Sequence, residues 1–118
     1  MTLKDCYAAL GGDYEDVMAR LRSESLVQKF VLKFPADQSY ELLLDSLEKG
    51  DVQEAFRAAH TIKGMCQNLS FTGLADASSA MTEALRAGDL AGGKALLDRV
   101  REEYRRAVAA IGAFQAQQ

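Results

Sequence analysis

The sequence predicts an all-α protein, an antiparallel four-helix bundle with short N-terminal helices that cover one end of it. Three observations predict this fold class. Helix-forming residues dominate the 118-residue composition, and proline occurs once. No segment alternates apolar and polar residues as a half-buried strand would. A Gly-Asp pair, at 50–51 and again at 88–89, separates amphipathic segments by turns short enough to favour antiparallel neighbours.

Short helices are predicted over residues 1–34. A pair of glycines at 11–12 ends the first helix, and Asp13 can cap the second. Ser25 and Gln28 have the spacing of a capping box, so a third helix is expected to begin there. Its apolar residues recur at helical spacing: Leu26, Val27, Phe30, Val31 and Phe34.

The four-helix bundle is predicted over residues 35–116. Pro35 interrupts the preceding pattern, and Asp51 is followed by Glu54 at a capping-box spacing. A glycine pair at 92–93 weakens the first turns of the last helix. The four helices are expected at about 36–49, 51–69, 71–87 and 89–115. Their inward stripes are Tyr40, Leu43, Leu44 and Leu47 in the first, Leu74, Met81 and Leu85 in the third, and Leu97, Val100, Tyr104, Val108 and Ile111 in the last.

Size and charge exclude several classes of protein. The length fits one domain, residues 1–118, and an apolar content of 48% is enough for a core. A net charge of -3 argues against nucleic acid as a partner, because binding by phosphate neutralisation needs a basic face. No apolar run is long enough to span a bilayer and no signal-peptide pattern is present. We therefore expect a cytoplasmic protein without membrane contact, and a bundle of this size can be a monomer.

The cysteine content does not indicate a metal site. Cys6 and Cys66 fit free thiols in a reducing compartment. A structural zinc site needs about four ligands, which one histidine and two distant cysteines do not supply. We expect no metal and no other cofactor on this chain.

His60 is the only histidine in the chain, and helical geometry places it on the solvent side of its helix. Each residue advances about 100° around a helix, and the half opposite His60 collects the apolar residues. That core half comprises Ala55, Ala58, Ala59, Ile62, Met65, Cys66 and Leu69. The half that His60 shares comprises Gln53, Phe56, Arg57, Lys63, Gly64 and Gln67. The imidazole is therefore expected to be exposed.

Gly64 and Lys63 distinguish this face from an inert surface. A glycine inside a helix costs about 1 kcal/mol relative to alanine, so its place one turn after an exposed histidine needs a reason. The missing side chain leaves room beside the imidazole for a bulky reactant or a partner protein. Lys63 supplies a positive charge that can stabilise an anionic group on the imidazole. Gln53, Phe56 and Arg57 are the candidate docking residues around it.

A family resemblance is carried by the run AHTIKG, in which His60, Lys63 and Gly64 have the spacing H-x-x-K-G. The run resembles the histidine-containing phosphotransfer (HPt) domain of His–Asp phosphorelays. LLLDSLEKGDVQEAF before it looks like the family's helix–turn–helix approach to the site, and CQNLSFTGLADASSAMTEAL after it looks like the next helix. The N-terminal LKDCYAALGGDYEDVMARL resembles the leader of stand-alone bacterial members, so nearly the whole chain is covered.

Three positions depart from the family pattern. Met65 and Cys66 stand where the family usually has small residues, and Ser70 stands where a glycine is common. Because helical counting directs Met65 and Cys66 to the core, these departures are expected to alter packing rather than chemistry.

The resemblance implies that His60 carries a phosphoryl group between aspartates of response-regulator receiver domains, with Nε2 as the nucleophile. Lys63 would offset charge on the transferring group, Gly64 would leave room for the receiver's loops, and Gln67 could donate a hydrogen bond to a phosphoryl oxygen. In this family the Mg²⁺ belongs to the receiver. The chain has no Gly-rich phosphate loop, so neither ATP binding nor self-phosphorylation is expected. The implied partners are receiver domains and a hybrid sensor histidine kinase.

Two other functions stay open at this point. One is a helical adaptor, or a degenerate HPt fold, that binds signalling partners without phosphotransfer, although the intact triplet argues against such a loss. The other is a small enzyme that uses His60 as a general base, which requires a pocket and an orienting carboxylate. Helical spacing places no carboxylate beside His60 on its exposed face.

Overall fold

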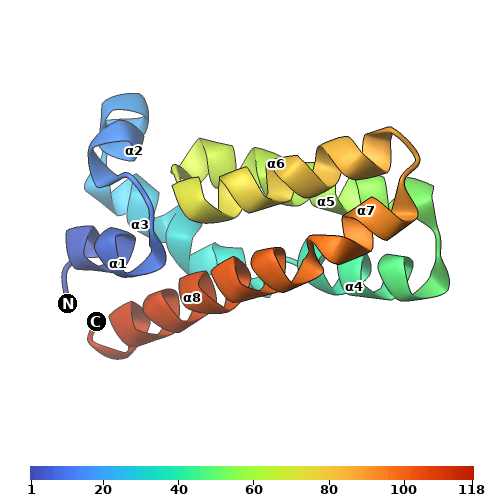
Figure 1. Ribbon diagram of the computed structural model, residues 1–118. Coiled ribbons are helices and arrows are strands. Elements are labelled where there is room, and N and C mark those ends of the chain that lie inside the picture. Colours follow the sequence, from blue (N-terminus) through green and yellow to red (C-terminus); the bar gives the residue numbers. More distant parts are fainter.

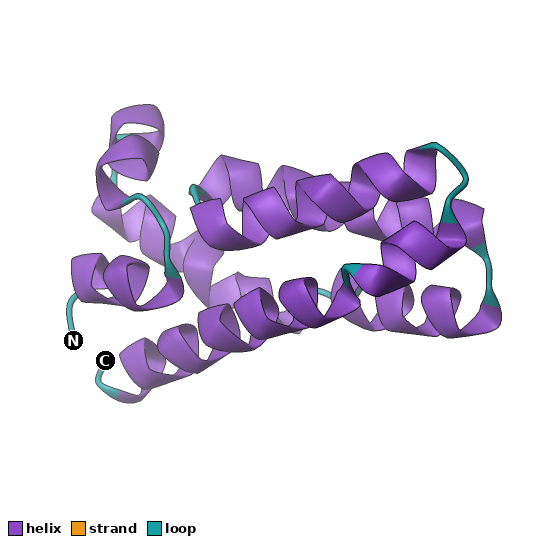
Figure 2. Ribbon diagram, in the orientation of Figure 1, coloured by secondary structure: helices purple, strands orange, loops and turns teal.

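The structure is a computed structural model that describes residues 1–118, and all of its regular elements are helical. Short loops join them (Figure 2). The prediction of an all-α protein is confirmed. The elements in chain order are α1 (Leu3–Leu10), α2 (Tyr14–Leu21), α3 (Glu24–Lys33), the 3₁₀ turn η1 (Phe34–Ala36), α4 (Ser39–Lys49), α5 (Val52–Leu69), α6 (Thr72–Arg86), α7 (Leu90–Ala95) and α8 (Leu97–Ala116).

The long helices form a helical bundle, and the whole molecule is elongated, with extents of 40 × 26 × 18 Å (Figure 1). Helix α5 packs against α4 on one side and α6 on the other, and α6 also packs against α8. Helices α1, α2 and α3 gather at one end, where α1 packs against α8. Both chain termini lie at this end, and the Met1 amino group donates a hydrogen bond to the Gln117 side chain. None of the helices combines the length and the apolar character that crossing a bilayer requires.

The turn between α4 and α5 has the structure that its sequence predicts. Gly50 ends α4 in the left-handed region, at φ 74°, which a glycine adopts without the steric cost of a Cβ atom. Asp51 then caps α5, because its Oδ1 accepts a hydrogen bond from the backbone N–H of Glu54 at 3.1 Å. Helix α5 therefore begins at a fixed point, one residue after its cap.

Two helix starts differ from the prediction. Ser23, and not Ser25, caps α3: its Oγ accepts from the Leu26 N–H at 3.2 Å while its backbone is extended. Ser25 lies inside the first turn, so the predicted capping box is wrong. The first bundle helix begins at Ser39 rather than at residue 36, because Asp37 is extended and its carboxylate accepts from the Ser39 N–H at 2.8 Å.

The helix predicted over 89–115 is divided at Leu96 into α7 and α8. The Leu96 N–H donates to the Gly93 carbonyl at 3.1 Å, which is an i→i−3 bond that tightens the backbone. Gly93 is buried against α6, where an added Cβ would stand 2.6 Å from a methyl carbon of Leu85. Gly93 thus allows close packing of α7 against α6, in addition to the weakening that the glycine pair brings to the helix.

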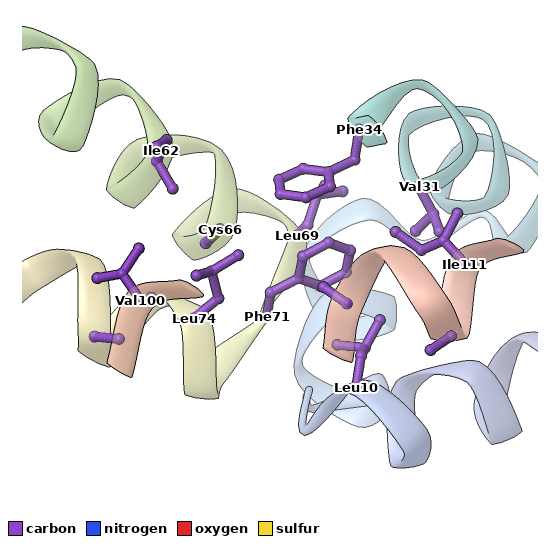
Figure 3. Close-up of a cluster of buried hydrophobic side chains, with 14 of the residues drawn as sticks. Leu10, Val31, Phe34, Ile62, Cys66, Leu69, Phe71, Leu74, Val100 and Ile111 are labelled. Carbon is purple, nitrogen blue, oxygen red and sulfur yellow. The ribbon is translucent and has the colours of Figure 1, made fainter. Parts of the chain in front are cut away.

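The core is continuous from the N-terminal helices into the bundle. Phe71, fully buried between α5 and α6, lies in the close-up among side chains from α1, α3, α5, α6 and α8 (Figure 3). Its ring packs edge-on against Phe34 at 5.2 Å and against Tyr7 at 5.6 Å. The predicted inward residues that are buried are Leu43, Leu47, Leu74, Met81, Leu85, Val100 and Ile111, whereas Tyr40, Leu44, Leu97, Tyr104 and Val108 are half-buried.

Candidate functional site

The histidine lies in the middle of α5 and faces solvent. The His60 side chain is exposed, as the helical count predicts, and it forms no hydrogen bond or ion pair with the rest of the chain. Beneath it the alanines, Ile62, Cys66 and Leu69 of the predicted core half are buried. Met65 is the exception, since it is half-buried at the edge of that half. The imidazole is therefore presented on a helix whose opposite side is anchored in the core.

The surface beside His60 is open at Gly64. A Cβ atom built on Gly64 would have no neighbour within 4 Å, so no packing inside the chain explains the glycine. Gln53, Arg57 and Gln67 are exposed on the same face, and Lys63 is half-buried at its edge. The structure thus brings all the sequence-predicted site residues to one side of α5.

Phe56 occupies the other side of the imidazole, and α6 supports it. The Phe56 and His60 rings stack with centroids 5.8 Å apart and planes 17° apart. The Arg86 guanidinium lies over the Phe56 ring, with Cζ 4.9 Å from the centroid. Arg86 also forms an ion pair with Glu83, at 3.4 Å. The aromatic ring beside His60 is therefore contacted by a cation of α6, which is itself paired with a carboxylate.

Arg57 is less free than its exposure suggests. Its guanidinium forms an ion pair with Glu54 at 2.6 Å, and its carbonyl accepts a hydrogen bond from the Thr61 hydroxyl at 2.9 Å. The ion pair with Glu54 partly neutralises the positive charge of Arg57. Lys63 is therefore the cation of the His60 face that has no ion pair.

The C-terminal carbonyls of α5 are held by the N-terminal helices. Arg20 of α2 donates to the carbonyls of Gln67 at 3.2 Å and Asn68 at 2.6 Å, and the buried Tyr7 hydroxyl of α1 donates to the Leu69 carbonyl at 2.7 Å. These last carbonyls have no partner within the helix itself. The leader of the chain therefore fixes the end of the helix that carries His60.

Ser70 ends α5 in a conformation that usually favours glycine. Its φ is 57°, which explains why a glycine suits this position. The serine hydroxyl donates to Asp16 at 2.6 Å and accepts from Arg20 at 3.2 Å. The hydrogen bond from Ser70 and the nearby Arg20 charge hold the pKa of the Asp16 carboxyl below its usual value. These contacts offset the strain of a non-glycine residue in the left-handed region.

A shallow hollow lies beyond Gly64, between α3 and α5. Its volume is about 200 Å³, and its lining comprises Phe30, Lys33, Phe34, Asp37, Met65, Asn68 and Leu69. Phe30 and its neighbour Leu26, one turn earlier on α3, are each 37% exposed. Large apolar side chains that stay this exposed often mark a contact surface. The hollow thus lies along the flank of α5 that faces α3.

The two thiols lie away from this face. Cys6 and Cys66 are free and fully buried, and burial raises the pKa of the Cys6 thiol to about 11 and that of the Cys66 thiol further still. Both therefore stay protonated near neutral pH and act as small apolar side chains. No group of three or more His, Cys, Asp and Glu side chains is placed to hold a metal ion.

A comparison with protein-family models matches the Hpt domain over residues 25–110. The chain belongs to the Hpt-domain family. Hpt domains serve histidine phosphotransfer in phosphorelays and interact with receiver domains and kinases of two-component systems. Searches of the curated proteins and of the solved structures found no match. The matched region begins in α3, so α1 and α2, which hold the end of α5, lie outside it.

Helical counting within α5 did not find Arg86, Tyr7 or Arg20. Each contacts the site helix from another element, at a separation of at least 30 residues, which periodicity in one helix does not address. Arg86 had one available signal: it occupies the last turn of its predicted helix, before the turn at Gly88. In an antiparallel pair that turn lies beside the early part of α5.

Proposed function

We propose that this protein is a phosphoryl carrier of a His–Asp phosphorelay, in which His60 accepts a phosphoryl group from one receiver-domain aspartate and passes it to another. The observation that carries the proposal is the pairing of an exposed imidazole with the open space at Gly64, in a member of the Hpt-domain family. In this reading α4, α5, α6 and α8 are the antiparallel four-helix bundle of the family.

The transfer step is an in-line displacement at phosphorus. The lone pair of His60 Nε2 attacks the phosphorus of the receiver's phospho-aspartate, a P–N bond forms, and the P–O bond to the aspartate breaks. The aspartate leaves as a carboxylate, and Nδ1 keeps its proton, so phospho-His60 is an imidazolium. The reverse displacement by a second receiver's aspartate restores the neutral imidazole.

The chain's own contribution is positioning and charge. Lys63 would lie close enough to offset negative charge on the phosphoryl oxygens, and Gln67, two turns along the same face, is a candidate hydrogen-bond donor. Mg²⁺ would be held by the receiver. The carrier therefore needs no nucleotide site, and its catalytic share is small compared with that of its partner.

The docking surface for the receiver would extend from Gln53 and Arg57 past Gly64 to the α3–α5 hollow. Its exposed Phe30 and Leu26 supply apolar area, while Lys63 and Lys33 supply positive charge at the rim. A receiver domain with an apolar patch beside its acidic phosphorylation site would complement this surface. A hybrid sensor kinase, which carries such a domain, is the upstream partner we propose, and the carrier would act as a monomer.

The proposal is tested with a receiver domain charged with ³²P-labelled phosphate. The label should move to the wild-type chain and should be acid-labile and alkali-stable, as phosphohistidine is. His60→Gln should acquire no label while keeping the helical circular dichroism of the wild type. A chain that binds the charged receiver but never acquires label would be an adaptor, and label that persists in His60→Gln would assign the phosphoryl group to another residue.

A further inference from the structure

Arg86, Phe56 and His60 form a row in which Arg86 contacts the Phe56 ring and that ring contacts the imidazole. The phosphoryl transfer described above gives Phe56 and Arg86 no role. The imidazole is exposed and has no hydrogen-bond partner in the chain, so nothing polar fixes its χ angles. The contact that does restrain it is the nearly parallel stack on Phe56, with the ring planes 17° apart. Stacked rings at centroid separations of about 4.5–7 Å attract each other beyond their buried area.

The Phe56 ring is itself restrained from the neighbouring helix. Phe56 is half-buried, so its ring packs against the core at one edge, and the Arg86 guanidinium covers part of its face at 4.9 Å. Glu83 holds Arg86 by an ion pair one turn earlier on α6. The contacts that restrain the imidazole therefore involve two helices: Phe56 of α5 touches it, and Arg86 of α6 holds Phe56.

We infer that Phe56 and Arg86 are positioning residues for phosphoryl transfer. Arg86 holds the Phe56 ring, and the ring holds the His60 imidazole in one orientation on the exposed face of α5. The inference rests on the proposed role of His60. It assigns to Phe56 a task other than docking, because a ring stacked on the imidazole constrains the nucleophile in the free protein as well as in the complex.

Positioning and docking have different kinetic consequences. In single-turnover transfer from a labelled phospho-receiver, loss of positioning lowers the limiting rate at saturating receiver, whereas loss of docking raises the half-saturating receiver concentration. Phe56→Leu removes the flat ring and keeps apolar bulk, and Phe56→Tyr keeps the ring. We expect Phe56→Leu to lower the limiting rate about fivefold with an unchanged half-saturating concentration, and Phe56→Tyr to retain the wild-type rate.

Arg86 is tested in the same assay against a matched arginine. Arg86→Gln should lower the limiting rate about two- to threefold, because the Phe56 ring loses its cation but keeps its packing. Arg99→Gln removes the same charge from an exposed residue of α8, a helix that contributes no residue to the row, and it should leave both parameters unchanged. Equal effects of the two substitutions would mean that Arg86 acts only through net charge, and would overturn its assignment.

The second measurement needs no phosphotransfer. Because His60 is the only histidine, its ring resonances are read without assignment from a ¹H–¹⁵N long-range spectrum. The Phe56 ring current should shift the imidazole protons in the wild type and in Phe56→Tyr, and the shift should vanish in Phe56→Leu and shrink in Arg86→Gln. Identical His60 resonances in the wild type and Phe56→Leu would overturn the inference.

The two measurements separate the inference from the function on which it rests. Wild-type protein that accepts no phosphoryl group from any receiver would refute the proposed function, while the His60 resonances would still decide whether the row orients the ring. An increase in half-saturating concentration for Phe56→Leu, with an unchanged limiting rate, would return Phe56 to a docking role and contradict the positioning role.

Discussion

Gly64 is the residue at which helix stability and access to His60 conflict. An alanine would fit there without contact, since no atom lies within 4 Å of the Cβ position, and it would favour the helix. A glycine at this place therefore serves something outside the chain. The space that it leaves lies one turn from the imidazole, on the side away from Phe56, where a receiver would approach in the proposed function.

Substitutions of Gly64 should separate stability from transfer. Gly64→Ala should raise the free energy of unfolding by about 1 kcal/mol, measured by urea denaturation. Gly64→Leu should lower the rate of phosphoryl transfer from a receiver on the order of tenfold, because its side chain fills the approach to Nε2. Both variants should keep the wild-type circular dichroism spectrum. Unchanged transfer in Gly64→Leu would show that the steric explanation is wrong.

Tyr7 is a second residue whose role can be isolated. Its hydroxyl is fully buried and satisfies the Leu69 carbonyl at the end of α5, and burial raises its pKa. Tyr7→Phe keeps the ring and leaves that carbonyl unpaired, so it should lower the free energy of unfolding by about 1–2 kcal/mol. Urea denaturation monitored by circular dichroism measures this change. A loss within experimental error would mean that water replaces the hydroxyl.

At the scale of the element, α5 is fixed at both ends by contacts of different kinds. Its first turn is held by a residue next to it in the sequence, since Asp51 caps the helix from the position before Val52. Its end is held from a distance by Tyr7 and Arg20, and by Ser70 through Asp16. Contacts at both ends of α5 restrict fraying and so help to keep His60 in a fixed position on the bundle.

The contact between Asp16 and Ser70 should make the stability of α5 depend on pH. Because the folded-state pKa of Asp16 lies below the ordinary value of 3.8, its carboxylate stabilises the fold above that pH and ceases to do so as the pH falls below it. Asp16→Asn should therefore be less stable than the wild type near neutral pH, and the difference should shrink under acid conditions. Urea midpoints across this pH range measure the difference, and one that is constant with pH would contradict the assignment.

Local signals predicted those element boundaries that depend on adjacent residues. Gly50 and Asp51 are sufficient to predict the turn between α4 and α5, and the structure confirms that turn. Ser23 and Ser25 are both plausible caps two residues apart, and only the backbone conformation decides between them. The break at Leu96 coincides with an i→i−3 hydrogen bond to Gly93, which packs against Leu85 of another helix. The spacing of apolar residues within 89–115 gives no sign of that contact.

At the level of the whole molecule, the exposed position of the site residues could be predicted from the sequence. The contacts from other helices that hold those residues in place could not. The positions of His60, Gly64 and Gln67 follow from the periodicity of one helix. The contacts that hold the site join distant segments: Arg86 to Phe56 across two helices, and Arg20 to α5 across almost half the chain. Such pairings arise from the way helices pack and have no signature in the spacing of either partner.

The N-terminal helices α1 and α2 contribute to the structure around the candidate site, because they contact the end of the helix that carries His60. The Hpt-domain match begins at residue 25, yet α1 and α2 supply hydrogen bonds at the end of α5, and α1 packs against α8. A chain without its first 22 residues would lose Tyr7, Asp16 and Arg20 together. The leader is therefore expected to matter for the order of α5 as well as for the stability of the bundle.

Transfer of the phosphoryl group onward from His60 is tested by a chase of the loaded carrier. Wild-type protein labelled by a phospho-receiver is freed of that receiver and mixed with a second, unphosphorylated receiver and Mg²⁺. If His60 is a shuttle, label should leave it and appear on the second receiver's aspartate faster than it is lost as inorganic phosphate without a receiver. Label that stays on the chain, or decays at the same rate with and without the second receiver, would contradict a shuttle through His60.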